Sequence, residues 1–135
     1  MTIYDKTYIV KARGGTNAKF DVEFYETAEG DQPAREFMLS LDRKMRAKLT
    51  NMIALLQDNG YELREPYSKH LSEGIFELRT KVGSDITRVL YFFYVDQRII
   101  LTNGFVKKTQ KTPPREIERA KKYRADYLSR REDRK

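Results

Sequence analysis

The side chains best suited to chemistry lie between Ile75 and Pro113. Arg79 and Arg88 fall in two successive strand-like runs, IFELRT and ITRVLYFFYV. A third run, RIILTNGFV, is followed by three lysines: Lys107, Lys108 and Lys111. Because a strand places alternate side chains on opposite faces of a sheet, cations from several strands can share one polar face. Such a face can hold a phosphodiester, so the stretch predicts RNA or DNA as the ligand.

Arginine is well matched to this task. Its guanidinium fork engages two phosphate oxygens and stays protonated at any relevant pH. The alternative for Arg79 and Arg88 is a surface salt bridge to Glu77 or Asp85. The three lysines are spaced too irregularly for one helix face, which favours a loop that grips nucleic-acid backbone over a solvated surface. Phe105, just before them, can stack on a base, although an aromatic at the end of a strand is more often core.

If the ligand were an RNA cleaved by its own 2′-hydroxyl, the site would also need a base and an acid. His70 is the only histidine, and its unperturbed pKa lies near neutrality. It is therefore an acid–base candidate, although a lone histidine ahead of a strand is more often a packing or surface residue. Glu77 is a second candidate base.

Metal or cofactor chemistry receives no support from the sequence. One histidine, no cysteine and scattered acidic residues give no ligand cluster of familiar spacing. There is also no glycine-rich phosphate cradle. We expect a site that uses neither a metal ion nor a cofactor.

The net charge of +7 is concentrated at one end of the chain. Residues 1–104 carry 15 Lys/Arg and 15 Asp/Glu, whereas residues 105–135 carry 12 and 5. This asymmetry is typical of a polyanion site, the alternative being a basic helix that only keeps the protein soluble.

Hydrophobic periodicity predicts an α+β fold in the order β-α-α-β-β-β-α, with a mainly antiparallel sheet and the helices packed on one of its faces. Asp42 and Thr112 are the expected caps of the second and last helices. The expected elements are a strand from Phe20, helices from Pro33 to Leu41 and from Asp42 to Asn59, strands at 75–81, 86–95 and 98–106, and a last helix after Thr112.

The length of 135 residues fits one domain. We expect it to span residues 19–135, with residues 1–18 as an N-terminal extension or edge hairpin. The start MTIYDKTYIV does not resemble a secretion signal, and no run is long and apolar enough for a membrane span. The sequence therefore predicts a soluble, cytoplasmic protein.

Four segments carry a resemblance to a known family: EPYSKHL, GIFELRT, TRVLYF and above all LTNGFVKKTQKTPPREIERAK. They resemble the HigB branch of the RelE-like toxins, phage-related mRNA interferases of type II toxin–antitoxin systems. The resemblance implies a small RelE-like sandwich that cuts mRNA on the ribosome. It also implies a cognate antitoxin, a helix-turn-helix protein that inhibits the toxin.

The resemblance assigns roles to individual residues. Arg79 and Arg88 match the family's basic positions on the phosphate, and Lys108 matches a basic position at the edge of the active site. His70, chosen for its pKa and not from the resemblance, completes the expected catalytic set. RNA binding is expected of Lys107, Lys111, Phe105 and Arg115.

Two departures leave the proton transfers unassigned. Glu77 stands where relatives carry a lysine, and Thr112-Pro113-Pro114 stands where some relatives place a catalytic tyrosine. Tyr91, Tyr94 and Tyr123 remain available, but the sequence selects none of them. The alternatives are a non-catalytic nucleic-acid-binding module on the same fold, or a protein whose only partner is its antitoxin.

Overall fold

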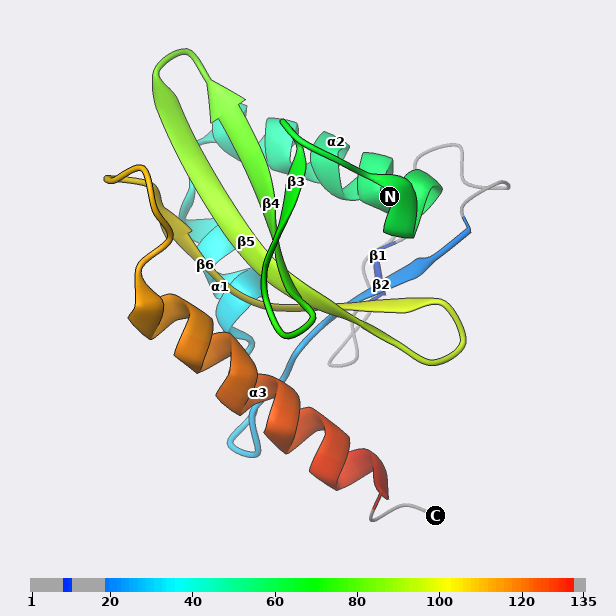
Figure 1. The fold of residues 1–135 in the computed structure, drawn as a ribbon. Coiled ribbons are helices and arrows are strands. Elements are labelled where there is room, and N and C mark those ends of the chain that lie inside the picture. Colours follow the sequence, from blue (N-terminus) through cyan, green and yellow to red (C-terminus); the bar gives the residue numbers. More distant parts are fainter. Residues whose placement is uncertain (1–8, 11–18, 133–135) are drawn as a thin grey trace.

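The computed structural model describes residues 9–10 and 19–132, which form one sheet with helices on both sides (Figure 1). The strands are β1 (Ile9–Val10), β2 (Asp21–Phe24), β3 (Ser68–Ser72), β4 (Ile75–Val82), β5 (Asp85–Tyr94) and β6 (Arg98–Val106). The helices are α1 (Pro33–Ser40), α2 (Arg43–Asn59), the short 3-10 helix η1 (Gly60–Glu62) and α3 (Pro114–Glu132). The α+β class is confirmed. The predicted order is met apart from two added strands, β1 and β3.

The sheet has the strand order β1-β2-β6-β5-β4-β3. Neighbouring strands are antiparallel except β2 and β6, which run parallel. Within the predicted extension, Ile9 and Val10 pair with β2 as an edge strand, whereas residues 1–8 and 11–18 lie outside the described residues.

Tight turns connect the long strands β4, β5 and β6. Gly83 turns the first connection at a φ of +62°, and Asp96 and Gln97 turn the second at +61° and +57°. Two successive residues of positive φ are typical of a hairpin turn whose twist matches its strands. The predicted three-strand meander is therefore confirmed, with bounds within one residue of those expected.

The helix starts follow local signals. Pro33 occupies the first turn of α1, and Asp42 caps α2 by accepting a 2.8 Å hydrogen bond from the backbone N–H of Met45. Gly60 ends α2 at a φ of +50°, and a Cβ there would lie 2.0 Å from the Phe20 ring. For α3 the expected cap is wrong: the Thr112 hydroxyl bonds Glu77 and Arg88 instead.

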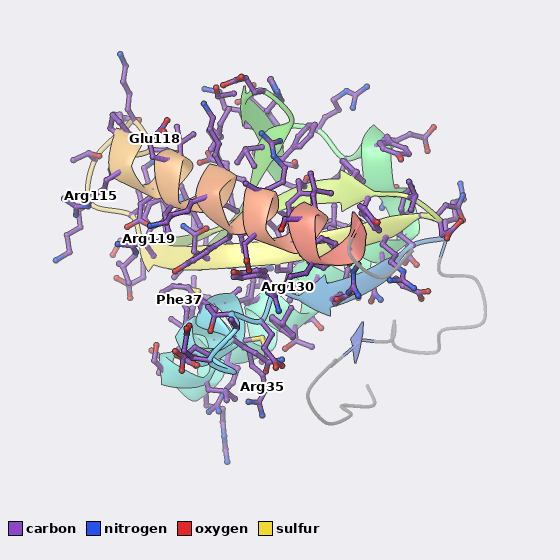
Figure 2. All side chains as sticks on the ribbon, turned by 90° about the horizontal axis from the view of Figure 1, so that it is seen from below. Arg35, Phe37, Arg115, Glu118, Arg119 and Arg130 are labelled. Atoms are coloured by element: carbon purple, nitrogen blue, oxygen red, sulfur yellow. The ribbon has the colours of Figure 1, made fainter. Side chains whose placement is uncertain are left out.

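The helices cover both faces of the sheet, not one. Figure 2 shows α3 on one side of the strands and α1 with α2 on the other. Tyr91, Ile99 and Leu101 pack in the core on the α1 and α2 side, whereas Leu90 and Ile100 pack in the core on the α3 side. Runs such as VLYFFY and IIL place apolar side chains on both faces, so both must be shielded from water. The expectation of helices on a single face is therefore wrong.

Candidate functional site

Four side chains lie in register across the α3 side of the sheet. Arg79 of β4 stands opposite Arg88 of β5, which stands opposite Phe105 of β6. On the other flank, the backbone N–H of Arg79 donates to the carbonyl of Tyr67 at 2.8 Å, which extends the β3–β4 pairing by one residue. Directly opposed residues of antiparallel strands share a face. The shared face predicted for the two arginines is confirmed.

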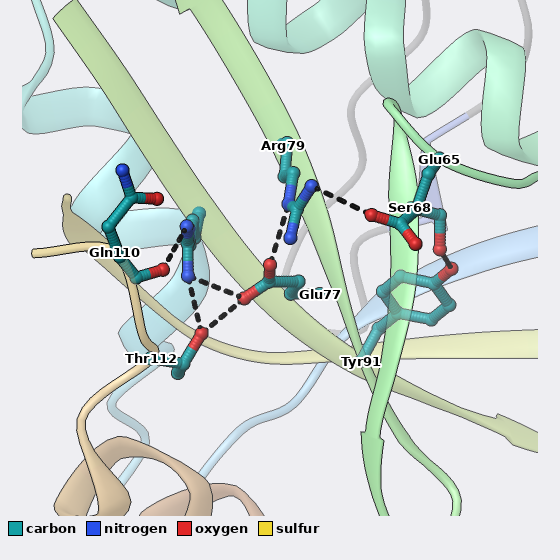
Figure 3. Close-up of polar contacts among 8 residues, drawn as sticks. Glu65, Ser68, Glu77, Arg79, Tyr91, Gln110 and Thr112 are labelled. Carbon is teal, nitrogen blue, oxygen red and sulfur yellow. Dashed lines mark hydrogen bonds and ion pairs between the residues drawn. The ribbon is translucent and has the colours of Figure 1, made fainter.

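The carboxylate of Glu77 holds both guanidinium groups. Its Oε2 accepts from Nε of Arg79 at 2.7 Å, and its Oε1 accepts from Nη1 of Arg88 at 3.2 Å (Figure 3). Oε1 also accepts from the hydroxyl of Thr112. Glu77 is fully buried, so these charge-assisted bonds replace its lost hydration. Both arginines therefore form the salt bridges to Glu77 that were the alternative to phosphate binding. The shared carboxylate is buried and not at the surface, and the cluster of two arginines and one glutamate keeps one net positive charge.

Arg88 joins this cluster to the loop between β6 and α3. Only 3% of the residue is exposed. Its Nη1 donates to the Thr112 hydroxyl at 2.6 Å, and its Nη2 donates to the carbonyl of Gln110 at 3.0 Å. Arg88 therefore fixes the loop that carries Lys107 and Lys111, and its own guanidinium is largely occupied.

Arg79 is the arginine that meets solvent. Its side chain is 24% exposed, and its Nη1 donates to the exposed carboxylate of Glu65 at 3.4 Å. Within the described residues its Nη2 forms no hydrogen bond. Glu77 orients the guanidinium from below while its outer edge faces the open side, so an incoming phosphate can replace the weak contact to Glu65.

A groove of about 700 Å³ lies over the arginines. Among the residues that the structure describes, one carboxylate, that of Glu65, lines it, against seven cationic side chains. These come from α2, β3, β4, β5 and the loop before α3: Lys48, Lys69, Arg79, Lys81, Arg88, Lys107 and Lys111. Cations converging from five segments create a strongly positive potential, which attracts and orients a polyanion.

Of the residues that the sequence predicted to contact RNA, some line the groove and others lie outside it. Lys107 and Lys111 line the groove. Lys108, in contrast, lines two neighbouring clefts beyond the loop, one of which it shares with Phe105 and Arg115. Phe105 packs against the core under α3, and Arg115 is exposed on α3 (Figure 2). None of these three residues lines the groove, although Phe105 is the cross-strand neighbour of Arg88.

His70 lies in β3 and not in the loop expected for it. It pairs with Phe76, so the two side chains share the face opposite to that of Arg79. The His70 ring packs edge-on against Phe76 with centroids 5.0 Å apart, and its Nε2 accepts from the backbone N–H of Gly74 at 3.0 Å. His70 nevertheless borders a small cleft of about 260 Å³ that Arg79 and Arg88 also line. The contacts of its ring are those of a packing residue.

The three tyrosines considered for proton transfer are packed elsewhere. The Tyr91 hydroxyl bonds Ser68 at 2.5 Å on the α2 side of the sheet (Figure 3), and burial raises its pKa to about 12. Tyr123 stacks on Tyr25, and Tyr94 packs edge-on against Tyr127. None of the three lines the groove.

Sequence reasoning missed part of the groove lining: Lys48, Tyr67, Lys69 and Lys81. Tyr67 and Lys69 stand in EPYSKHL, a segment already singled out for its resemblance, and this was the available signal. Lys81 follows Arg79 at the two-residue spacing of one strand face. The sequence did not indicate a site role for Lys48, because no feature of its helix distinguishes it from the other exposed lysines.

Among the residues that the structure describes, no three His, Cys, Asp or Glu side chains gather as metal ligands would. The helices of the same residues include none with the length and apolar character needed to cross a bilayer.

Comparison with known proteins places the chain in a family. The model of the family described as "Phage derived protein Gp49-like (DUF891)" matches residues 36–125. The chain belongs to this family. It is a RelE-like, toxin-like family, so the family match supports the resemblance seen in the sequence at the level of the superfamily. The match runs from α1 to α3 and includes every residue that lines the groove. A search of curated proteins found no match.

Proposed function

We propose that this Gp49-like protein is the toxin of a type II toxin–antitoxin system, a HigB-type endoribonuclease that cleaves mRNA on the ribosome. The observation that carries the proposal is the pair of arginines held by the buried Glu77 beneath a groove lined by seven cations. Such a site suits a strand of nucleic acid, because it offers fixed donors to one phosphate and mobile lysines to its neighbours.

In the proposed reaction the 2′-oxygen attacks the adjacent phosphorus and the bond from phosphorus to the 5′-oxygen breaks. A base takes the 2′-hydroxyl proton, and the leaving 5′-oxygen gains a proton. The products are a 2′,3′-cyclic phosphate and a 5′-hydroxyl. Arg79 stabilises the charge that develops on the phosphoryl oxygens, and Glu77 keeps its guanidinium oriented before the substrate arrives.

The ribosome contributes to this reaction by positioning the message. Alignment of the 2′-oxygen, phosphorus and leaving oxygen supplies much of the rate in such a displacement. The lysines of the groove and of the loop before α3 would bind the backbone of mRNA or ribosomal RNA. A helix-turn-helix antitoxin is the proposed protein partner.

The test is cleavage of a defined mRNA on purified ribosomes, with mapping of the new ends. We expect fragments with 5′-hydroxyl and 2′,3′-cyclic phosphate ends, and growth arrest when the gene is expressed without its antitoxin. Arg79→Ala should lower cleavage by about ten- to a thousandfold and weaken the growth arrest. Arg119→Ala is the matched control, because Arg119 is a half-exposed arginine of α3 that lies outside the groove. Intact mRNA with the parent protein would refute the proposal.

A second candidate function is non-catalytic nucleic-acid binding at the same groove. It is favoured by the position of His70, whose imidazole Nε2 is already bonded to Gly74 on the opposite face. Under this reading the protein binds ribosomes or RNA with the same dependence on Arg79, but no message is cut and expression does not slow growth.

A further inference from the structure

The groove has an apolar part as well as a cationic one. Met52 of α2, Ile86 of β5, and Pro66 and Tyr67 from the segment before β3 line it together with the lysines and arginines. Tyr67 is the most prominent of these, because 47% of this large aromatic residue is exposed. A purely electrostatic phosphate site gains nothing from an exposed phenol ring, so the ring calls for a separate explanation.

The backbone fixes where Tyr67 stands. Its carbonyl accepts the N–H of Arg79 at 2.8 Å, and the next pairs along the two strands are Ser68 with Leu78 and Lys69 with Glu77. Tyr67 therefore lies directly opposite Arg79 and on the same face. Adjacent strands are about 4.8 Å apart. The Tyr67 ring and the Arg79 guanidinium are therefore carried by neighbouring chain segments and lie on the same face.

The Tyr67 ring is free to accept a partner. Within the described part of the chain it makes no ring contact and its hydroxyl makes no hydrogen bond. Tyr61 provides the contrast. It is more exposed, at 59%, yet its ring packs on Phe20 and Phe93 with centroids 5.2 and 4.2 Å apart.

We propose that Tyr67 is a nucleobase platform: the base of the nucleotide whose phosphate is bound by Arg79 stacks on the Tyr67 ring. The inference rests on the proposed function, since it takes single-stranded RNA as the ligand. A phosphate and its base are joined through the sugar, so a cation and an aromatic ring on adjacent strands match two parts of one nucleotide. Stacking on aromatic side chains is a general means of holding unpaired bases, and it tolerates any base because each has a π face.

A stacking role uses the ring and not the hydroxyl. Tyr67→Phe should therefore bind RNA as the parent does, whereas Tyr67→Ala should bind about ten- to a hundredfold more weakly, the range seen when one stacking ring is removed. The slope of affinity against salt concentration should be the same in all three proteins, because the number of phosphate contacts is unchanged.

The test uses the full chain and short single-stranded RNAs that carry 2-aminopurine at one position in turn. The fluorescence of this base falls when it stacks. We expect quenching at one position with the parent and with Tyr67→Phe, and no quenching with Tyr67→Ala even at RNA concentrations that saturate the protein. Tyr61→Ala is the matched control, as an exposed tyrosine outside the groove, and should quench like the parent.

Three results would overturn the inference: no quenching by the parent at any position, undiminished quenching by Tyr67→Ala, or a Tyr67→Phe variant that fails as Tyr67→Ala does. The last result would mean that the Tyr67 hydroxyl, and not its ring, makes the contact to RNA. The assay does not depend on cleavage. Quenching that requires Tyr67, combined with uncut mRNA on ribosomes, would refute the ribonuclease proposal while supporting the platform.

Discussion

Removal of the Glu77 carboxylate should strongly destabilise the protein. Glu77 is fully buried and accepts hydrogen bonds from Arg79, Arg88 and Thr112. In Glu77→Ala the buried guanidinium of Arg88 loses its counter-ion. Loss of one partner from a buried ion pair costs about 3–5 kcal/mol. A domain of this size has a free energy of unfolding of about 5–15 kcal/mol, so the change is a large fraction of the total.

Urea denaturation followed by circular dichroism measures this cost. With an m-value of about 2 kcal/mol per M, the midpoint should fall by about 2 M. Glu118→Ala is the control, because Glu118 is an exposed glutamate of α3 whose one salt bridge among the described residues is to Lys121. Its midpoint should stay close to that of the parent. Replacement of both charges, in Glu77→Leu with Arg88→Met, should recover part of the loss, since a buried pair exchanged for apolar side chains is far less costly than a half pair.

Two results would refute this reasoning. The first is a midpoint for Glu77→Ala no lower than that of Glu118→Ala, which would mean that the carboxylate does not neutralise a buried charge. The second is a double variant that loses the sum of the two single losses, which would mean that Glu77 and Arg88 act independently.

The remaining predictions concern the groove. Arg79→Ala should lower single-turnover cleavage on ribosomes by about ten- to a thousandfold, which is the effect of removing one preorganised donor. The urea midpoint should change little, because the side chain is partly exposed. An unchanged cleavage rate would remove Arg79 from the site. Lys111→Ala should reduce the salt slope of RNA binding by about 0.7, the value for one phosphate of a single strand. Lys108→Ala, outside the groove, should change that slope less, and equal slopes for the two variants would place the RNA elsewhere. His70→Gln should leave the cleavage rate and its pH profile nearly unchanged, since the ring packs on the other face of the sheet; a hundredfold loss with the fold intact would make His70 catalytic.

The structure changes the relative weight of the two arginines. The sequence places both arginines on the phosphate, with no reason to treat them differently. Arg88 is instead buried and bonded to Glu77, Thr112 and Gln110. Its replacement should therefore lower stability and release the loop before α3. The clean probe of phosphate binding is Arg79.

The sequence by itself determined the elements and the sheet face of the arginines. Two-residue alternation and turn residues located β4, β5 and β6, and Asp42 located the start of α2, because these signals act between near neighbours in the chain. The same alternation placed Arg79 and Arg88 on one face. It also placed a cluster of lysines in the loop after β6, two of which line the groove.

Only the tertiary structure decided what surrounds the arginines. β3 lacks the apolar alternation of a strand, and its segment is extended because β4 supplies its hydrogen bonds. That pairing packs the His70 ring on Phe76 and brings Tyr67 and Lys69 to the groove, while the packing of α2 brings Lys48. The burial of Glu77 beneath both guanidinium groups likewise depends on α3 and its preceding loop closing over the sheet. These contacts join residues far apart in the chain, and their presence depends on which elements pack together, which no local pattern encodes.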